Sequence, residues 1–127
     1  MPLVYYGAWR VAVLNFIEEI NPANIERFER HNETDEVFVL LRGKAVLFLG
    51  KGETEVEGLF SHSMEQDIVY NVKRGVWHAI VLSRDASVLI IENADTGSQN
   101  SQQLALMSGQ RQFVFETARR EQPGCWS

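Results

Sequence analysis

The strongest constraint on the fold is a series of short apolar runs. Runs rich in Val, Ile, Phe and Leu recur between turn-forming residues, whereas helical periodicity is hard to find. This pattern is typical of an all-β sandwich or barrel. It predicts strands at residues 9–16, 25–30, 36–41, 44–49, 67–72, 77–83, 87–92 and 112–116.

Short links between these runs predict antiparallel pairing of neighbouring strands. Arg42-Gly43 and Arg84-Asp85 are two-residue links of hairpin length. Gly50-Lys51-Gly52 is a hairpin-like turn and lacks the spacing of a phosphate-binding loop. The pattern weakens over residues 53–66, where an irregular strand and a loop are equally good descriptions.

The end of the chain is more polar than the rest. Residues 93–100 form a turn-prone stretch, and residues 101–107 are expected to make one helical turn before the strand at 112–116. No repeat or linker interrupts the 127 residues, 45% of which are hydrophobic. We therefore expect a single domain over residues 1–127 with one core.

Charge and hydropathy exclude several classes of partner. Twelve Lys and Arg against seventeen Asp and Glu give a net charge of -5 without a basic run, so nucleic acid is not expected. Apolar runs such as 37–41 and 88–91 fall far short of the ~20 residues that span a bilayer. Residues 1–16 lack a signal-peptide pattern, and the single cysteine, Cys125, forms no internal disulfide. These features predict a soluble cytoplasmic protein.

Two stretches carry residues suited to metal chemistry. Glu29, His31 and Glu36 lie close together before an apolar strand, and His78 follows a glycine turn at the start of another. Residues two apart in a strand share a face, so Glu29 and His31 point the same way. Imidazole nitrogen and carboxylate oxygen are ligands for zinc, iron, manganese and nickel. The alternative to metal binding is that each histidine makes only structural hydrogen bonds.

The first stretch resembles the first motif of the cupin superfamily, H-x-H, three or four residues, E, six residues, G. Here the motif positions hold Glu29-x-His31, four residues, Glu36, six residues and Gly43. The resemblance implies His31 and Glu36 as metal ligands. Glu29 replaces the family's first histidine.

The second stretch resembles the second cupin motif, P-x-G-x-x-H-x-x-x-N. This chain has Lys73-x-Gly75-x-x-His78, with Leu82 where the family has asparagine and Lys73 where it has proline. The resemblance covers about residues 25–91. It implies a cupin-type antiparallel β-barrel of jelly-roll form and His78 as the third ligand.

The role of Glu29 has several alternatives. It is a fourth ligand to a divalent ion of zinc, iron, manganese or nickel, a residue that hydrogen-bonds to a three-ligand site, or a catalytic general base. Loss of the metal is a further alternative, because some cupins use the barrel as a metal-free polar pocket.

A narrower resemblance concerns the substrate. Residues 70–82 and 92–101 are similar to segments of the ureidoglycolate lyase family, whose members act on a small carboxylate with a carbon–nitrogen bond. Candidate substrate-binding residues are Arg27, Lys73, Tyr70 and Trp77. Each has an alternative without substrate binding. Arg27 would be solvated or paired with Glu29, and Lys73 would belong to an ordinary surface turn. Tyr70 and Trp77 would pack in the core.

The predicted function is that of a metal-dependent enzyme of lyase, isomerase or dioxygenase type acting on a small polar or carboxylate-bearing metabolite. The alternative is a non-catalytic binding or sensing cupin. Phe38, Leu40 and Leu82 are expected inside the barrel, and His62 on the surface. Strand 9–16 or the strand around residues 113–115 is expected to contact a second subunit, which predicts a homodimer.

Overall fold

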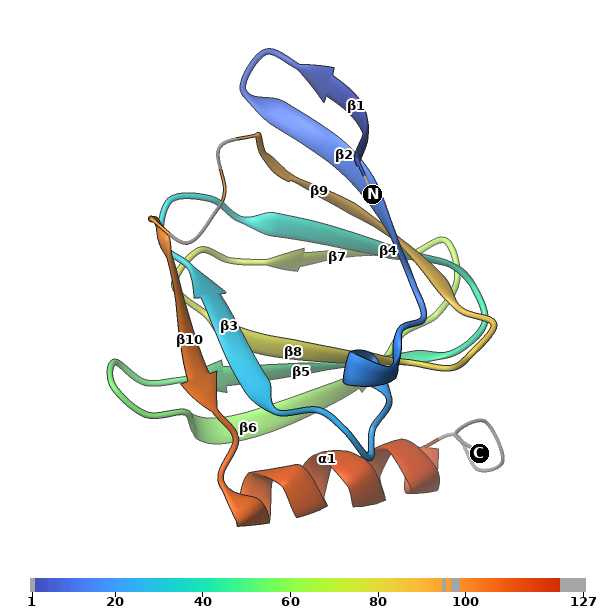
Figure 1. Cartoon of the computed structure of the whole chain (residues 1–127), viewed down its shortest axis with the longest axis vertical. Coiled ribbons are helices and arrows are strands. Elements are labelled where there is room, and N and C mark those ends of the chain that lie inside the picture. The colour runs from blue at the N-terminus through green and yellow to red at the C-terminus, as the bar shows by residue number, and fades with distance from the viewer. Residues whose placement is uncertain (1, 95, 97–98, 122–127) are drawn as a thin grey trace.

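The computed structural model describes residues 2–94, 96 and 99–121 and contains two five-stranded antiparallel sheets (Figure 1). In the first sheet the strand order is β1-β2-β9-β4-β7. Its strands are β1 (Pro2–Tyr6), β2 (Trp9–Asn15), β4 (Glu36–Arg42), β7 (Val69–Val72) and β9 (Ser87–Asn93). β1 and β2 form an N-terminal hairpin, and β1 was not predicted from the sequence.

The second sheet has the order β10-β3-β8-β5-β6. Its strands are β3 (Arg27–His31), β5 (Ala45–Lys51), β6 (Glu57–Ser63), β8 (Trp77–Leu82) and β10 (Ser101–Ala105). A 3-10 helix, η1 (Glu18–Ile20), follows β2, and the helix α1 (Ser108–Glu121) follows β10. In the described part of the chain, no helix is long and apolar enough to cross a bilayer.

The two short links do not form hairpins, so that prediction was wrong. β4 pairs with β7 and β9, whereas β5 pairs with β6 and β8, so Arg42-Gly43 carries the chain from one sheet to the other. Arg84-Asp85 does the same between β8 and β9. The links pack together, since a Cβ on Gly43 would lie 2.5 Å from the Cα of Ala86. Link length alone does not distinguish a hairpin from a crossing between sheets.

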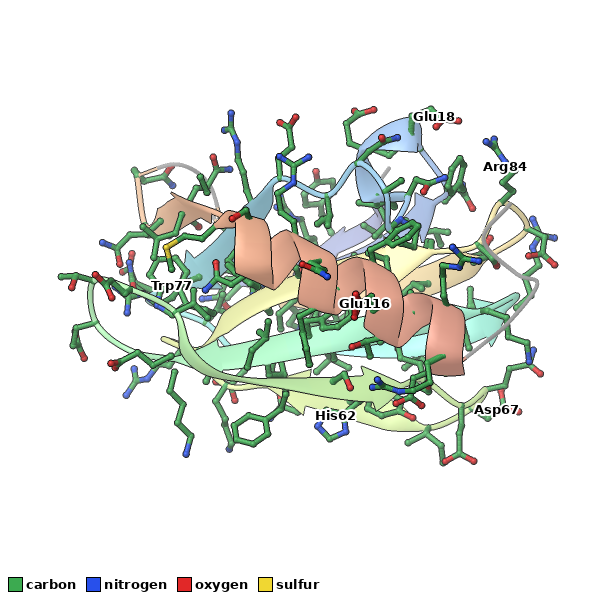
Figure 2. All side chains as sticks on the ribbon, turned by 90° about the horizontal axis from the view of Figure 1, so that it is seen from below. Glu18, His62, Asp67, Trp77, Arg84 and Glu116 are labelled. Atoms are coloured by element: carbon green, nitrogen blue, oxygen red, sulfur yellow. The ribbon has the colours of Figure 1, made fainter. Side chains whose placement is uncertain are left out.

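The space between the sheets holds the first core. Phe38, Leu40 and Leu82 are at most 2% exposed there, as predicted. A second core, which contains Phe28 and Phe48, lies outside the second sheet and includes Val114 and Ala118 of α1. Figure 2 shows α1 lying across this face of the molecule. His62, on β6, is exposed, also as predicted.

The C-terminal predictions were wrong. Residues 101–107 contain strand β10 rather than a helical turn, and residues 112–116 lie in α1 rather than in a strand. Val114, Thr117 and Ala118 are the buried residues of α1, at the spacing of three and four that places them on one helix face. The run Phe113-Val114-Phe115 has the composition of a strand, but both phenylalanines are 36% exposed.

Candidate metal centre

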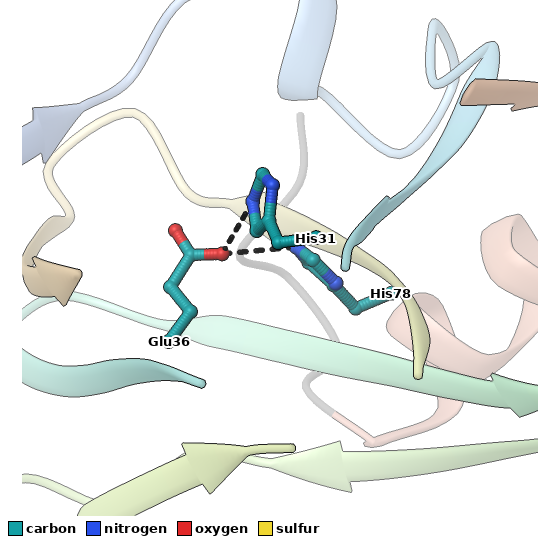
Figure 3. A group of neighbouring side chains, drawn as sticks. All are labelled: His31, Glu36 and His78. Atoms are coloured by element: carbon teal, nitrogen blue, oxygen red, sulfur yellow. Dashed lines mark ion pairs between the residues drawn. The ribbon is translucent and has the colours of Figure 1, made fainter. Parts of the chain in front are cut away.

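The candidate metal centre is formed by three buried side chains from three strands. His31 ends β3, Glu36 begins β4 and His78 is the second residue of β8 (Figure 3). Each residue is at most 7% exposed, and each offers one ligand atom within 4.8 Å of the other two. The three residues with matching cupin-motif positions are therefore brought together.

Glu36 lies between the two imidazole rings. Its Oε1 atom is 3.0 Å from His31 Nε2 and 3.1 Å from His78 Nε2. Neither approach has the direction of a hydrogen bond, so this buried oxygen has no hydrogen-bond partner. A buried charged acceptor without a hydrogen bond costs more than the ~1–3 kcal/mol of a neutral one, and here the ion pairs with His31 and His78 offset part of that cost. One oxygen and two imidazole nitrogens at these distances fit the ligand set of a divalent cation.

The outer nitrogen of each ring fixes its tautomer. His78 Nδ1 lies 3.3 Å from the Val76 carbonyl oxygen, which only accepts hydrogen bonds, so Nδ1 carries the proton. His31 Nδ1 lies 2.7 Å from Ser101 Oγ, whose own hydrogen is directed to Asn100 Oδ1 at 3.5 Å. In the neutral rings each Nε2 atom then carries the lone pair, and both Nε2 atoms lie within 3.1 Å of Glu36 Oε1. Histidine ligands in metal sites are oriented in the same way.

The electrostatics of the cluster favour positive charge at its centre. Burial, the largest influence, lowers the pKa of His31, but Glu36, Glu29 and Glu92 together outweigh it and raise that pKa. Burial raises the pKa of Glu36, but His31 and His78 outweigh it and lower that pKa. A proton or a metal cation therefore stabilises this cluster.

The turn before β8 connects the ligand-bearing segments. The Gly75 N–H donates a 2.8 Å hydrogen bond to the His31 carbonyl, and the Arg74 N–H donates one of 2.8 Å to Asp35 Oδ1. The Arg74 N–H is also the main cause that lowers the pKa of Asp35. Gly75 has φ +81°, a conformation that favours glycine. The glycine of the second motif thus joins the strand of one histidine to the turn that precedes the other.

A cavity of about 440 Å³ adjoins the triad. It is lined by Arg10, Glu29, His31, Glu36, Glu92, Thr96, Ser101 and Gln103. Glu29 lies at this cavity with 43% of its side chain exposed, and its Oε1 is 3.2 Å from His31 Nε2. The structure therefore brings Glu29 to the edge of the site, although it is not one of the three residues whose ligand atoms lie within 4.8 Å of one another.

Arg10 and Glu92 belong to the cavity wall and were missed by the sequence reasoning. Arg10 Nη2 lies 2.7 Å from Glu92 Oε1, and Glu92 Oε2 lies 3.9 Å from His31 Nε2. Burial and then Glu36 raise the pKa of Glu92, against the Arg10 hydrogen bond. The two residues are 82 positions apart and become neighbours only through the β2–β9 register. No local spacing in the sequence signals this pair.

Trp77 does not reach the cavity. It precedes His78 on β8, and adjacent strand residues face opposite sides, so Trp77 lies in the core beneath α1, 2% exposed (Figure 2). Its Nε1 donates to the Gly52 carbonyl at 2.9 Å, and the Arg30 guanidinium lies 4.3 Å above its ring. Strand alternation therefore places this predicted substrate-binding residue on the wrong side of the sheet.

The other three substrate-binding candidates do not line the 440 Å³ cavity, but Arg27 lines an adjoining cavity of about 640 Å³ that shares Glu29 and Gln103 with it. Arg27 shares a face with Glu29 but is exposed and donates to Gln103 Oε1 at 2.8 Å. Lys73 is exposed in the turn before β8. Tyr70 packs against the interior core, and its hydroxyl accepts a 2.8 Å hydrogen bond from the Glu65 N–H.

Comparisons with known proteins place the fold. No protein-family model matches the chain, and no curated protein matches it. A QdtA 3,4-ketoisomerase from Thermoanaerobacterium thermosaccharolyticum, solved with TDP, has a TM-score of 0.55 at 14% identity, over 90% of this chain and 75% of that one. Streptomyces PAC13 with uridine has a TM-score of 0.56 at 8% identity, over 83% of this chain and 74% of that one.

A dTDP sugar isomerase from Desulfovibrio desulfuricans G20 has a TM-score of 0.56 at 12% identity, over 84% of this chain and 69% of that one. At such identities the likeness concerns the fold. The solved structures and the two antiparallel sheets together show that this chain has a cupin-type fold.

Proposed function

We propose that this protein is a metal-dependent enzyme acting on a small polar metabolite. The observation that carries the proposal is the buried Glu36 oxygen, which has no hydrogen-bond partner and lies between two imidazole nitrogens beside a cavity. His31, Glu36 and His78 would hold a divalent ion of zinc, iron, manganese or nickel. Lyase, isomerase and dioxygenase reactions are the reaction types that the proposal includes.

Such an ion, when bound, polarises a carbonyl, carboxylate or hydroxyl oxygen of the substrate. Glu29 is the residue placed to accept a proton, because its carboxylate borders the cavity and remains partly exposed. Ligation of the ion by Glu29 is the other role. The variant Glu29→Gln separates the two roles. If Glu29 is the base, the variant keeps its metal and turns over ~10²–10⁴-fold more slowly. If Glu29 is a ligand, the variant loses metal.

The charges of the cavity favour a neutral ligand with hydroxyl or amide groups. Glu29, Glu36 and Glu92 bring three carboxylates, and Arg10 brings one guanidinium that already pairs with Glu92. A divalent ion would make this set neutral, leaving no excess positive charge for an anionic group. The small ligands of two solved neighbours, TDP and uridine, support a small-molecule ligand. Ureidoglycolate lyase-like activity stays a prediction from the sequence resemblance.

A metal-free binding protein is the second candidate. It is favoured by the two ion pairs of Glu36, which give the cluster a stable protonated form without a metal. The same cavity would then bind a metabolite without turnover.

The test is a parallel turnover and binding screen. Metal-stripped protein is reloaded with zinc, iron(II), manganese or nickel and offered neutral hydroxylated metabolites and their carboxylate analogues. We expect turnover of a neutral compound in one metal form and its loss in His78→Ala. Binding of a compound without turnover in every metal form would instead support the second candidate.

We further propose that the protein is a homodimer, and exposed apolar residues of the N-terminal hairpin, such as Tyr6 and Trp9, support this part of the proposal.

A further inference from the structure

The cavity beside the triad continues into a second cavity of about 640 Å³. The two cavities share Glu29 and Gln103, which pair with each other across the neighbouring strands β3 and β10 (Figure 1). The next pair on the same face in one direction is His31 with Ser101, and both line only the first cavity. In the other direction lies Arg27, which lines only the second. The register of one strand pair therefore places the two cavities in a row.

The row is longer than a single-ring metabolite. Arg27 and His31 are four positions apart on β3, which corresponds to about 13 Å of strand at ~3.3 Å per residue. The second cavity is also the larger, with about 640 Å³ against about 440 Å³. A single ring bound at the triad would not fill it. The two cavities together fit a molecule of two units, one at the triad and one beyond Glu29.

The second cavity has both apolar and charged lining residues. Ile20 of η1 packs against the interior core, and Ile25, just before β3, is 7% exposed in the core beneath α1. The charged residues of the lining are two arginines and four carboxylates: Arg27, Arg111, Glu18, Glu19, Glu26 and Glu29. The charge of Glu18 is balanced from outside the lining, because its Oε1 lies 3.1 Å from Arg84 Nη1. The cavity therefore combines apolar surface with charges of both signs.

This mixture of charges selects against a ligand group that carries a net charge. A carboxylate in the second cavity would meet Glu19 and Glu26, and an ammonium group would meet Arg27 and Arg111. Hydroxyl groups avoid both conflicts, since they donate to carboxylates and accept from guanidinium groups. The lining thus favours a neutral, hydroxylated unit.

Gln103 has an amide group suited to such a unit. Its Oε1 accepts a 2.8 Å hydrogen bond from Arg27 Nη1, so the NH₂ group is the other end of an oriented amide. In the described part of the chain this NH₂ group has no hydrogen-bond partner. Because Gln103 lines both cavities, its NH₂ group is placed to donate to a ligand where the two cavities meet.

We infer that the second cavity binds the distal unit of a two-unit polyhydroxylated substrate, of the size of a disaccharide, whose first unit lies at the triad. The inference rests on the proposed function and names its substrate class. Arg27, Gln103 and Arg111 determine specificity by donating hydrogen bonds to hydroxyl groups of the distal unit. Arg27 thereby has the substrate-binding role expected from the sequence, at a place remote from the metal ligands.

The test is isothermal titration calorimetry with glucose, galactose and xylose and with the disaccharides maltose, lactose and xylobiose. The protein is loaded in turn with zinc, iron(II), manganese and nickel. Arg27→Met and Arg111→Met each remove one guanidinium from the second cavity and keep most of the side-chain volume. Arg119→Met is the matched control, because Arg119 is exposed on α1 and lines neither cavity. Circular dichroism checks that each variant is folded.

We expect at least one disaccharide to bind at least about 10-fold more tightly than its monosaccharide, because the distal unit adds several hydrogen bonds. Arg27→Met and Arg111→Met should each lower the affinity for that disaccharide about 3- to 10-fold, and Arg119→Met should leave it unchanged.

Two results would overturn the inference: no disaccharide binds more tightly than its monosaccharide, or Arg111→Met and Arg119→Met have equal affinities for the disaccharide. Turnover of a monosaccharide by a metal-loaded form would then leave the proposed function standing. Disaccharide binding with the expected losses, but without turnover in any metal form, would support the second cavity and contradict the proposed enzyme. Failure of the inference and failure of the proposed function are therefore distinguishable.

Discussion

Glu36 is a carboxylate in a position where burial alone would keep it protonated. His31 and His78 reverse that effect and lower its pKa, while the surrounding carboxylates raise the pKa of His31. The cluster is therefore built around a positive charge. Protonation of His31 is favoured in the metal-free protein, since its pKa is raised, and in the proposed enzyme a divalent ion would supply the positive charge instead.

Replacing Glu36 by glutamine tests its role as a ligand. Loss of a residue that only supports a ligand typically costs 10–100-fold in metal affinity, so loss of a direct ligand should cost at least about 100-fold. Competition with a chelating dye measures the affinity. Glu33→Gln is the matched control, since Glu33 is exposed just before β4. Equal affinities of the two variants would remove Glu36 from the ligand set.

The stability of the metal-free protein should have a maximum at mildly acidic pH. The contribution of Glu36, whose pKa is lowered, is present above its ordinary pKa of 4.5 and is lost as pH falls through the folded-state pKa. The contribution of His31, whose pKa is raised, is present below its ordinary pKa of 6.5 and is lost as pH rises through the folded-state pKa. Both are fully present between about 4.5 and 6.5.

Urea unfolding across pH 4 to 8 measures this maximum. In Glu36→Gln both contributions weaken, so the pH dependence should flatten. A wild-type profile that rises steadily to pH 8 would show that the cluster does not hold a proton in the way that its geometry indicates.

The candidate ligand residues were predictable from the sequence, but the cavity beside them was predictable only in part. His31, Glu36 and His78 stand at motif spacings that are visible in one dimension. Arg10 and Glu92 meet through strand pairing over 82 positions, which no motif encodes. Residues placed by pairing between distant strands need the register, and the register is known only from the fold.

At the scale of elements, Arg30 and Trp77 join four segments of the second sheet. Arg30 is only 7% exposed, with its guanidinium 4.3 Å above the Trp77 ring. It donates to Gln102 Oε1 at 2.9 Å and to the Gly52 carbonyl at 3.2 Å, and Trp77 donates to the same carbonyl. The pair thus connects β3 and β8 with β10 and the β5–β6 turn. Both residues directly precede a candidate ligand histidine.

Arg30→Met keeps most of the side-chain volume and removes these hydrogen bonds. We expect it to lower the free energy of unfolding by about 2–4 kcal/mol, because the buried guanidinium gives up several part-buried hydrogen bonds and its contact with the Trp77 ring. Arg84→Met is the control: its ion pair with Glu18 is 60% exposed on both sides and should contribute at most about 1 kcal/mol. Equal urea midpoints for the two variants would contradict the role given to Arg30.

The elements that sequence reasoning misjudged share a weak local signal. The run Phe113-Val114-Phe115 has the composition of a strand. It is helical because Val114, Thr117 and Ala118, spaced by three and four, are buried on one helix face, and this face packs on the second sheet. β6 lies in the weakly patterned residues 53–66, where pairing with β5 decides for a strand. In both places a tertiary contact overrides local preference.

At the scale of the whole molecule, the two sheets have different surroundings. The second sheet has a core on each face, the interior core and the one beneath α1, whereas among the described residues the first sheet has a core only on its inner face. The strand content and the two motifs predicted the cupin-type fold correctly. The crossings at Arg42-Gly43 and Arg84-Asp85 were not predictable, because a two-residue link has the same sequence in a hairpin and between sheets.

Metal binding should stabilise the whole fold, because its ligands come from both sheets. His31 and His78 lie in the second sheet and Glu36 in the first. A cation at 100 times its dissociation constant adds about 2.7 kcal/mol to the free energy of unfolding. Urea titrations with and without the metal measure this increment. An increment of the same size in His78→Ala would place the metal elsewhere on the protein.

The most direct test of the account is the metal content of protein purified without added metal or an affinity tag, compared with the same measurement on His78→Ala. The account predicts close to one divalent ion per wild-type chain, bound with two nitrogen ligands by X-ray absorption, and a large loss of metal in the variant. Wild-type protein that carries no metal and takes up none of the four ions when they are supplied would contradict it.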